Sequence, residues 1–138
     1  MALPVILPLA LGALVLVGCT KVASDVRKNR PLATLTGSEW GPVEAQAAEQ
    51  FVAFKSDGEI TGHGGCNQFF GQYTQTGQSL TVGALASTKK YCDGLMEAET
   101  QFLQNLQNTR RFEATHLKLS LFDADDNALM TLQRRDWD

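Results

Sequence analysis

The sequence predicts an α+β domain in which a curled, mostly antiparallel sheet packs against one main helix. Three observations support this fold class. Short apolar stretches with a period of two are separated by turn residues, which is typical of antiparallel strands. Residues 93–110 instead repeat their apolar side chains at helical spacing. About 120 residues follow an apolar N-terminal segment, and that length fits one compact domain.

The N-terminal part of the domain predicts one strand at Trp40 and then a β-hairpin. Trp40 ends the stretch 32–40 and is expected to begin the first core strand. Residues 50–55 are rich in aromatic and apolar side chains and are followed by an Asp-Gly turn at 57–58. Because Asp-Gly favours the tight turn of a β-hairpin, we expect the chain to return as a strand at 59–62.

The glycine-rich run from Gly62 to Asn67 departs from a plain strand pattern. Glycines in a strand mark a bulge or a tight crossing where two backbones approach closely, and we expect such a feature here. Phe69, Phe70 and Tyr73 then resume the apolar character. We expect these aromatics in the core, with a ligand platform as the alternative. Residues 80–84 alternate and predict a further strand.

The helical spacing of residues 93–110 predicts the main helix near residues 95–108. Asp93 is expected as its N-cap, and Arg110 and Arg111 stand at its end, where the helix dipole favours positive charge. One face is apolar and consists of Leu95, Ala98, Phe102, Leu103 and Leu106. Four polar side chains lie largely on the other faces, namely Glu97, Glu99, Gln101 and Gln104.

Two alternating stretches, 117–121 and 129–133, predict a closing hairpin. The turn between them, 123–127, is rich in aspartate and hints at a calcium loop. It has no glycine at the sharp-turn position and no glutamate at a suitable spacing. We therefore expect an ordinary hairpin turn.

The charge balance limits the partners of this chain. It carries 12 Lys and Arg against 15 Asp and Glu, a formal net charge of −3, without any block of basic residues. Nucleic acid is therefore not expected as a partner. The pairs at 89–90 and 110–111 are expected to be solvated surface charges, and we expect a monomer.

An apolar, uncharged stretch opens the chain at residues 1–18, and every charged side chain lies beyond Cys19. Such a stretch is either a short membrane anchor or the apolar part of a signal peptide, here without the usual basic residues before it. The run Leu16-Val17-Gly18-Cys19 resembles the lipobox of bacterial lipoproteins. The resemblance implies cleavage after Gly18 and lipid on the thiol of Cys19. The alternative is an uncleaved anchor helix with a buried cysteine.

The lipobox resemblance also sets the expected boundaries and location. Residues 1–18 become the signal peptide, residues 19–31 a lipidated N-terminus with a flexible polar tether, and residues 32–138 the folded domain. By resemblance to lipoproteins of Gram-negative bacteria, the absence of aspartate at Thr20 implies the outer membrane, with the domain facing the periplasm.

The chain has three cysteines, and an odd number leaves one without a disulfide partner in an exported protein. Lipid on Cys19 leaves Cys66 and Cys92 as a pair, and thiols in an oxidising envelope usually bridge. Closing a loop of about 26 residues would stabilise the fold by roughly 3 kcal/mol in the chain-entropy model. The alternative is two separate buried thiols that act as small hydrophobic side chains.

Two short motifs and their surroundings resemble one known family. The motifs are Gly65-Cys66-Asn67 and, further on, the T-x-x-x-C pattern from Thr88 to Cys92. The features around them fall in matching order: Trp40, Phe54, the run 62–67, Gly71, Tyr73, the strand 80–82, Glu99 and Phe102. Over roughly residues 32–133 the chain is similar to the META domain, also called the HslJ family.

The resemblance implies a compact α+β fold of mostly antiparallel strands, often presented on a lipoprotein. It also implies a link to heat shock and to novobiocin resistance, with no established enzymatic activity, no cofactor and no catalytic residues. The signature positions Gly65, Asn67, Gly71 and Thr88 are then structural or binding positions. Asn67 is expected in a positive-φ or side-chain-to-backbone turn.

Metal-binding and catalytic alternatives use the same segment. His63 and Cys66 could supply half of a metal site that His116 joins, or they could be a base and a nucleophile. Both histidines are isolated in the sequence, and a disulfide at Cys66 would remove the nucleophile. We therefore expect neither a metal nor catalysis.

Two function classes remain. The first is a non-enzymatic envelope protein that contributes to stress tolerance by contacting another envelope component. The second is an inhibitor of an enzyme such as lysozyme, an activity that small disulfide-stapled periplasmic lipoproteins often achieve by inserting a loop. An exposed, rigid loop from His63 to Asn67 would favour the inhibitor, and a buried loop would favour a structural signature.

Overall fold

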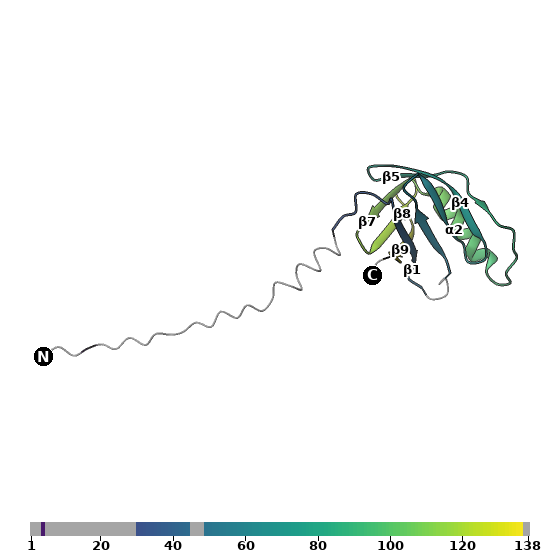
Figure 1. The fold of residues 1–138 in the computed structure, drawn as a ribbon, viewed down its shortest axis with the longest axis horizontal. Coiled ribbons are helices and arrows are strands. Elements are labelled where there is room, and N and C mark those ends of the chain that lie inside the picture. The colour runs from purple at the N-terminus through teal and green to yellow at the C-terminus, as the bar shows by residue number, and fades with distance from the viewer. Residues whose placement is uncertain (1–3, 5–29, 45–48, 137–138) are drawn as a thin grey trace.

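The computed structural model describes Pro4 and residues 30–44 and 49–136 (Figure 1). The expected signal peptide, the lipidation of Cys19 and most of the expected tether lie outside the described residues. Within the described part, the chain forms no helix that is long and apolar enough to cross a membrane.

Nine antiparallel strands and one helix make up the described part of the chain. The sheet order runs β1, β2, β3, β4, β5, β7, β8, β9, and β9 pairs back with β1, so the sheet closes into a barrel. The curled antiparallel sheet with one helix that the sequence predicts is confirmed. The elements are β1 (Ser38–Pro42), β2 (Phe51–Phe54), β3 (Glu59–His63), β4 (Gln68–Thr76), β5 (Ser79–Val82), β6 (Ala86–Ser87), α2 (Met96–Asn108), β7 (Arg111–Ala114), β8 (Lys118–Phe122) and β9 (Ala128–Arg134).

Alternation along the strands fills the barrel with apolar side chains. In β8, Leu119 and Leu121 are fully buried, whereas Lys118 and Ser120 are not. Closure gives each of these eight strands a neighbour on both sides, which removes free sheet edges. The largest fully buried side chains are Trp40, Phe54, Phe69, Phe112, Leu35, Ile60, Leu80, Leu106, Leu119, Leu121, Leu132 and Val52.

α2 lies across one end of the barrel. Just before β2, Nε2 of Gln50 donates to the carbonyl of Ala98 at 3.2 Å. Near the other end of the helix, Nδ2 of Asn105 donates to the carbonyl of Leu129, at the start of β9, at 3.4 Å. Phe102 points from this helix into the core. In Figure 1, α2 lies beside β4, on the side of the molecule away from β7.

The segment 31–35 covers the opposite end of the barrel. The N–H of Leu32 donates to the carbonyl of Ala114 at the end of β7, at 2.8 Å. The N–H of Leu35 donates to Oε1 of Gln75, near the end of β4, at 2.9 Å. Leu35 itself is fully buried. Residues ahead of the first strand are therefore part of the folded domain.

Two consecutive hydrogen bonds between buried groups link this segment to β1. The indole N–H of Trp40 donates to Oγ of Ser38 at 2.7 Å, and the Ser38 hydroxyl donates to the carbonyl of Leu35. The fully buried indole therefore has a partner, as a buried tryptophan N–H requires. Trp40 is the core aromatic that the sequence predicts for the first strand.

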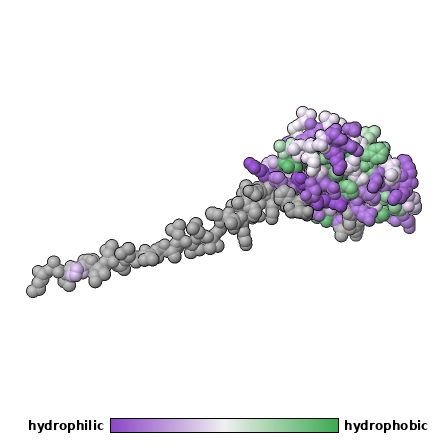
Figure 2. Space-filling view, viewed as in Figure 1, coloured by the Kyte–Doolittle hydropathy of each residue, from purple (hydrophilic) through white to green (hydrophobic). Residues whose placement is uncertain are grey.

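The expectation that Phe70 lies in the core is wrong. Phe69 and Tyr73 are buried, but Phe70 is 53% exposed. Adjacent residues of a strand point to opposite faces, so Phe69 and Phe70 cannot both face the barrel interior. The surface in Figure 2 is otherwise a mixture of hydrophilic and scattered hydrophobic residues.

The helix lies where residues 95–108 predict it, but Asp93 is not its N-cap. Leu95 takes that position without a side-chain capping bond. The N–H of Leu95 donates to the carbonyl of Cys92 at 3.2 Å, so Asp93 lies inside a turn that precedes the helix. At the other end, the guanidinium of Arg110 donates to the carbonyls of Gln107 and Thr109, which satisfies acceptors that the helix leaves open.

Two short strands lack a sequence signal, and one turn matches its prediction. Neither β6 nor β7 is predicted, because two and four residues are too few to establish an alternating pattern. The turn at 123–127 is an ordinary hairpin turn. There, Oδ1 of Asp123 accepts the N–H groups of Asp125 and Asn127, both at 2.9 Å.

Replacing Leu35 by alanine should destabilise the domain by about 2–5 kcal/mol, because it leaves a cavity at a fully buried position. Urea unfolding followed by circular dichroism measures the change. Val43→Ala, at a side chain that is 62% exposed, is the control and should stay within about 0.5 kcal/mol. An unchanged stability in Leu35→Ala would mean that the segment 31–35 does not contribute to the fold.

Candidate functional site

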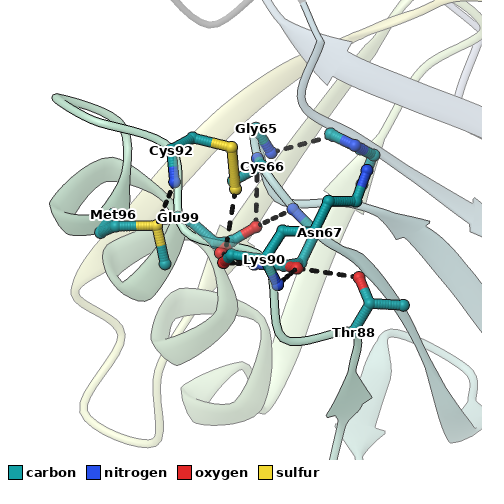
Figure 3. The surroundings of a disulfide bond; sticks show 9 residues. Gly65, Cys66, Asn67, Thr88, Lys90, Cys92, Met96 and Glu99 are labelled. Carbon is teal, nitrogen blue, oxygen red and sulfur yellow. Dashed lines mark hydrogen bonds between the residues drawn. A yellow bond between two sulfur atoms is a disulfide. The ribbon is translucent and has the colours of Figure 1, made fainter.

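The candidate site is built around the carboxylate of Glu99, which projects from α2 and is only 4% exposed. Its Oε1 accepts the backbone N–H groups of Cys66, at 3.2 Å, and of Asn67, at 2.5 Å. Its Oε2 accepts Nδ2 of Asn67 at 2.8 Å (Figure 3). These hydrogen bonds replace the water that the buried charge loses.

Asn67 connects this carboxylate to the segment that contains Thr88 and Lys90. Besides Glu99, its Nδ2 donates to the carbonyl of Lys90 at 3.0 Å. Its Oδ1 accepts the N–H of Lys90 at 2.7 Å and the hydroxyl of Thr88 at 2.9 Å (Figure 3). Both donors and both acceptor positions of the amide are thus in use. Asn67 therefore binds Lys90 through both of its backbone groups, much as a neighbouring strand would.

Cys66 and Cys92, the two cysteines expected to pair, form a disulfide with Cα atoms 5.8 Å apart. It joins the segment after β3 to the turn before α2. Sγ of Cys66 lies 3.6 Å from the carbonyl oxygen of Lys90, a packing contact because a disulfide sulfur has no hydrogen to donate. In this bridged state Cys66 has no thiol that could act as a nucleophile.

Two glycines let the segment approach Glu99. A Cβ atom on Gly64 would lie 2.6 Å from Cγ of Glu99, closer than atoms can pack. Gly65 has φ +116°, a conformation that side-chain-bearing residues rarely adopt. The tight crossing that the glycine run predicts is present. Gly62 lies so close to β2 that a Cβ would overlap the carbonyl oxygen of Phe51, and Gly64 lies against the helix.

The hydrogen bonds at Glu99 decide its charge. Burial opposes ionisation and raises the pKa, but the bonds from the side chain and backbone of Asn67 and the backbone of Cys66, together with nearby His63, outweigh it. The pKa therefore lies below its ordinary value of 4.5, and Glu99 is a carboxylate at neutral pH. The ring of His63 accepts the N–H of Gly65 on Nδ1 at 3.1 Å.

The structure brings three of the four signature residues together, and it keeps the two histidines apart. Gly65, Asn67 and Thr88 meet at this site. Gly71 lies further along β4, where a Cβ would come within 2.9 Å of the carbonyl of Ala84. His116 lies in the connection between β7 and β8, so it does not join His63.

Of the two alternatives expected for Asn67, the structure shows the side-chain-to-backbone contacts and not a positive φ. Among the described non-glycine residues, only Asp126 has a positive φ. Gly65, two residues earlier, takes the left-handed conformation instead. A glycine is available there and adopts it without steric cost.

The central role of Glu99 was missed by sequence reasoning, which placed it away from the apolar face. A signal was present, because Glu99 lies three residues before Phe102 and seven before Leu106, both of which are buried. That spacing puts all three side chains on one face of a helix. An acid within a buried stripe needs partners, and Asn67 supplies them.

An exposed loop lies directly over this buried site. In the signature loop, defined here as residues 88–95, the side chains of Lys89, Lys90 and Tyr91 are exposed, Tyr91 to 78%. Leu95 is 39% exposed. Asn67 fixes the backbone at Lys90, and the disulfide fixes it two residues later. The loop is thus held at two points while its side chains face solvent.

The polar groups of the site bind one another and the backbone, so the site holds three segments of the chain together. Glu99, Asn67 and the two cysteines all have their polar atoms or sulfurs engaged with one another or with backbone groups. Among the described residues, no three His, Cys, Asp or Glu side chains are grouped so that they could hold a metal ion.

Glu99→Gln should lower the free energy of unfolding by about 2–3 kcal/mol at pH 7, because its amide NH₂ faces donors where the carboxylate accepts charged hydrogen bonds. Glu97→Gln, on the same helix but exposed, is the control and should change little. Urea unfolding measures both.

The same carboxylate should make stability depend on pH. A lowered pKa in the folded state means that the stabilisation is complete above the ordinary value of 4.5 and is lost as the pH falls through the folded pKa. The gap between wild type and Glu99→Gln should therefore narrow below pH 4.5. Asp123, whose pKa is lowered by hydrogen bonds from Asn127, titrates in both proteins and cancels in the comparison. A gap that is constant down to pH 3 would contradict the assignment.

Solved structures resemble this chain in fold. A protein from Burkholderia xenovorans has a TM-score of 0.62 and 16% identity, with 95% of this chain and 100% of that chain covered. Another protein solved by NMR has a TM-score of 0.54 and 23% identity, with 73% and 90% covered. A DUF4847 family protein from Bacteroides vulgatus has a TM-score of 0.55 and 12% identity, with 84% and 99% covered.

At these identities the similarity shows the fold alone. No curated protein matches the sequence. The model of the META domain matches residues 33–136, which include all the strands and the helix that the structure describes and the whole Glu99 site. The chain therefore belongs to the META domain family.

Proposed function

We propose that this chain is a non-enzymatic, lipid-anchored protein of the cell envelope that contributes to stress or novobiocin-type antibiotic tolerance by binding an envelope component. Lipid on Cys19 would hold it on the periplasmic side of the outer membrane. Membership of the META family supports an envelope-type domain. The link to tolerance follows from the likeness to HslJ-type proteins noted in the sequence.

One observation carries the binding part of the proposal: Asn67 bonds both backbone groups of Lys90 while the next residue, Tyr91, is 78% exposed. A loop that is already ordered loses little conformational entropy when it binds a partner. Exposed tyrosines are frequent anchors in interfaces because a large amphipathic ring has few rotatable bonds.

The buried position of Cys66 and Asn67 argues against the loop first considered for the inhibitor alternative. Insertion of the segment from His63 to Asn67 requires an exposed segment, but Cys66 and Asn67 are each 3% exposed. An inhibitor would have to use Lys89 to Tyr91 instead. A lysozyme assay with wild type and Tyr91→Ala tests this version, because inhibition that disappears in the variant would favour it.

Lipid anchoring predicts a defined mature N-terminus. Mass spectrometry of the protein purified from membranes should find Cys19 as the first residue and at least two acyl chains on it, which is what stable anchoring requires. Cys19→Ala should abolish acylation and membrane retention. An intact residue 1–18 segment on the wild-type protein would overturn this part of the proposal.

Binding through the signature loop predicts a local contact in living cells. A photo-crosslinking amino acid at position 91 should give a discrete adduct with an envelope component, whereas the same probe at exposed Asp57, in the turn between β2 and β3, should not. A strain lacking the protein should become more sensitive to novobiocin, and Tyr91→Ala should fail to restore tolerance. Equal adducts at both positions, or full rescue by Tyr91→Ala, would contradict the proposal.

A further inference from the structure

Phe70 stands in the middle of an outward sheet face. Strand register places it beside Thr61 of β3 on one side and Ala86 of β6 on the other. Directly paired side chains on one face are about 5 Å apart. Since both neighbours are small, they leave the ring accessible, and Phe70 is 53% exposed.

The residues around this ring carry neutral hydrogen-bonding groups. Gln68 and Gln72 flank Phe70 on the same face of β4 and are exposed. Exposed Thr88 lies beside Gln68, since its N–H donates to the Gln68 carbonyl at 3.0 Å. We call this surface the Phe70 face, which comprises Thr61, Gln68, Phe70, Gln72, Ala86 and Thr88. It borders the signature loop, because Thr88 belongs to both.

The charge of the face limits what it can recognise. None of its six residues is charged. At its margins the register places Glu59 opposite Gln72 and His63 opposite Gln68, and Lys89 follows Thr88. An acidic peptide, a phosphate-rich lipid or a nucleic acid would find no paired cations within it. The charge complementarity is with an uncharged, polar ligand.

The shape and chemistry of the face fit a glycan chain. A pyranose ring presents a face of C–H groups that packs on an aromatic ring, while its hydroxyl and N-acetyl groups point outward. Glutamine amides both donate and accept hydrogen bonds, so Gln68 and Gln72 match those groups, while the Thr88 hydroxyl, which donates to Asn67, can still accept. Gln68 to Gln72 spans about 13 Å along one strand, a length that suits an extended chain.

We propose that the Phe70 face binds the glycan strands of peptidoglycan, the extended envelope polymer of N-acetylated sugar rings. This inference rests on the proposed function, because it names the chemistry of the envelope component. Phe70 stacks on a sugar ring, and Gln68 and Gln72 bind the hydroxyl and N-acetyl groups on either side of it.

Sedimentation with purified sacculi tests the proposal on the full lipidated chain in mild detergent. Wild type should cosediment, and chitohexaose, a soluble chain of N-acetylglucosamine, should compete. Phe70→Ala should weaken binding about tenfold or more. Phe70→Tyr keeps the ring and should retain binding, whereas Phe70→Leu keeps only apolar area and should lose it. Val43→Ala, at another exposed apolar side chain, is the control and should bind as wild type does.

The outcomes separate this inference from the proposed function. Sacculus binding that survives Phe70→Ala, or binding to lipopolysaccharide vesicles in place of sacculi, overturns the assignment to the Phe70 face. An adduct at position 91 without any sacculus binding would remove the glycan inference and leave the proposed function standing. Absence of both the adduct and sacculus binding would remove both.

Discussion

The arrangement of this domain depends on one buried negative charge. Glu99 projects from the helix into the segment between β3 and β4, where backbone and side-chain N–H groups surround its carboxylate. A buried carboxylate is costly unless every bond is made, so the helix, the glycine run and Asn67 must assemble together. The helix and the segment between β3 and β4 are joined at that charge, at the end of the barrel where the disulfide also lies.

Asn67 extends the influence of this charge to the surface. One of its amide protons meets Glu99, and its remaining hydrogen-bonding positions hold Thr88 and Lys90. The exposed residues of the signature loop are therefore fixed by buried ones, and the first residue of the loop also borders the Phe70 face. The two motifs of the sequence are halves of a single contact network, which explains why they occur together in this chain.

Sequence reasoning found the elements with strong periodicity and missed what depends on three-dimensional neighbours. Alternation and turn residues are local, so most strands and the helix could be predicted. Glu99 could not, because an acid near an apolar stripe becomes an interior residue only when a distant segment supplies donors. Phe70 failed for a related reason: aromatic character alone does not say which of two adjacent residues faces inward. Closure of the sheet depends on the β5–β7 contact, and β7 is too short to give a pattern.

The chain enters the barrel through the segment 31–35, at the end opposite the helix, and this affects how the domain responds to pulling. Tension applied ahead of Pro31 first reaches the segment 31–35, whose bonds to Ala114 and Gln75 lie at the far end of the barrel from the disulfide. The segment is held by single hydrogen bonds, a short bridge and the buried side chain of Leu35, and these contacts would bear the load before the strand pairs of the barrel. If a partner held the signature loop while the chain was pulled from its N-terminal side, the load would run through the whole barrel. The disulfide between Cys66 and Cys92 would then keep the end of the barrel that binds the partner from unfolding under load. The segment 31–35, at the opposite end, would be the part that extends.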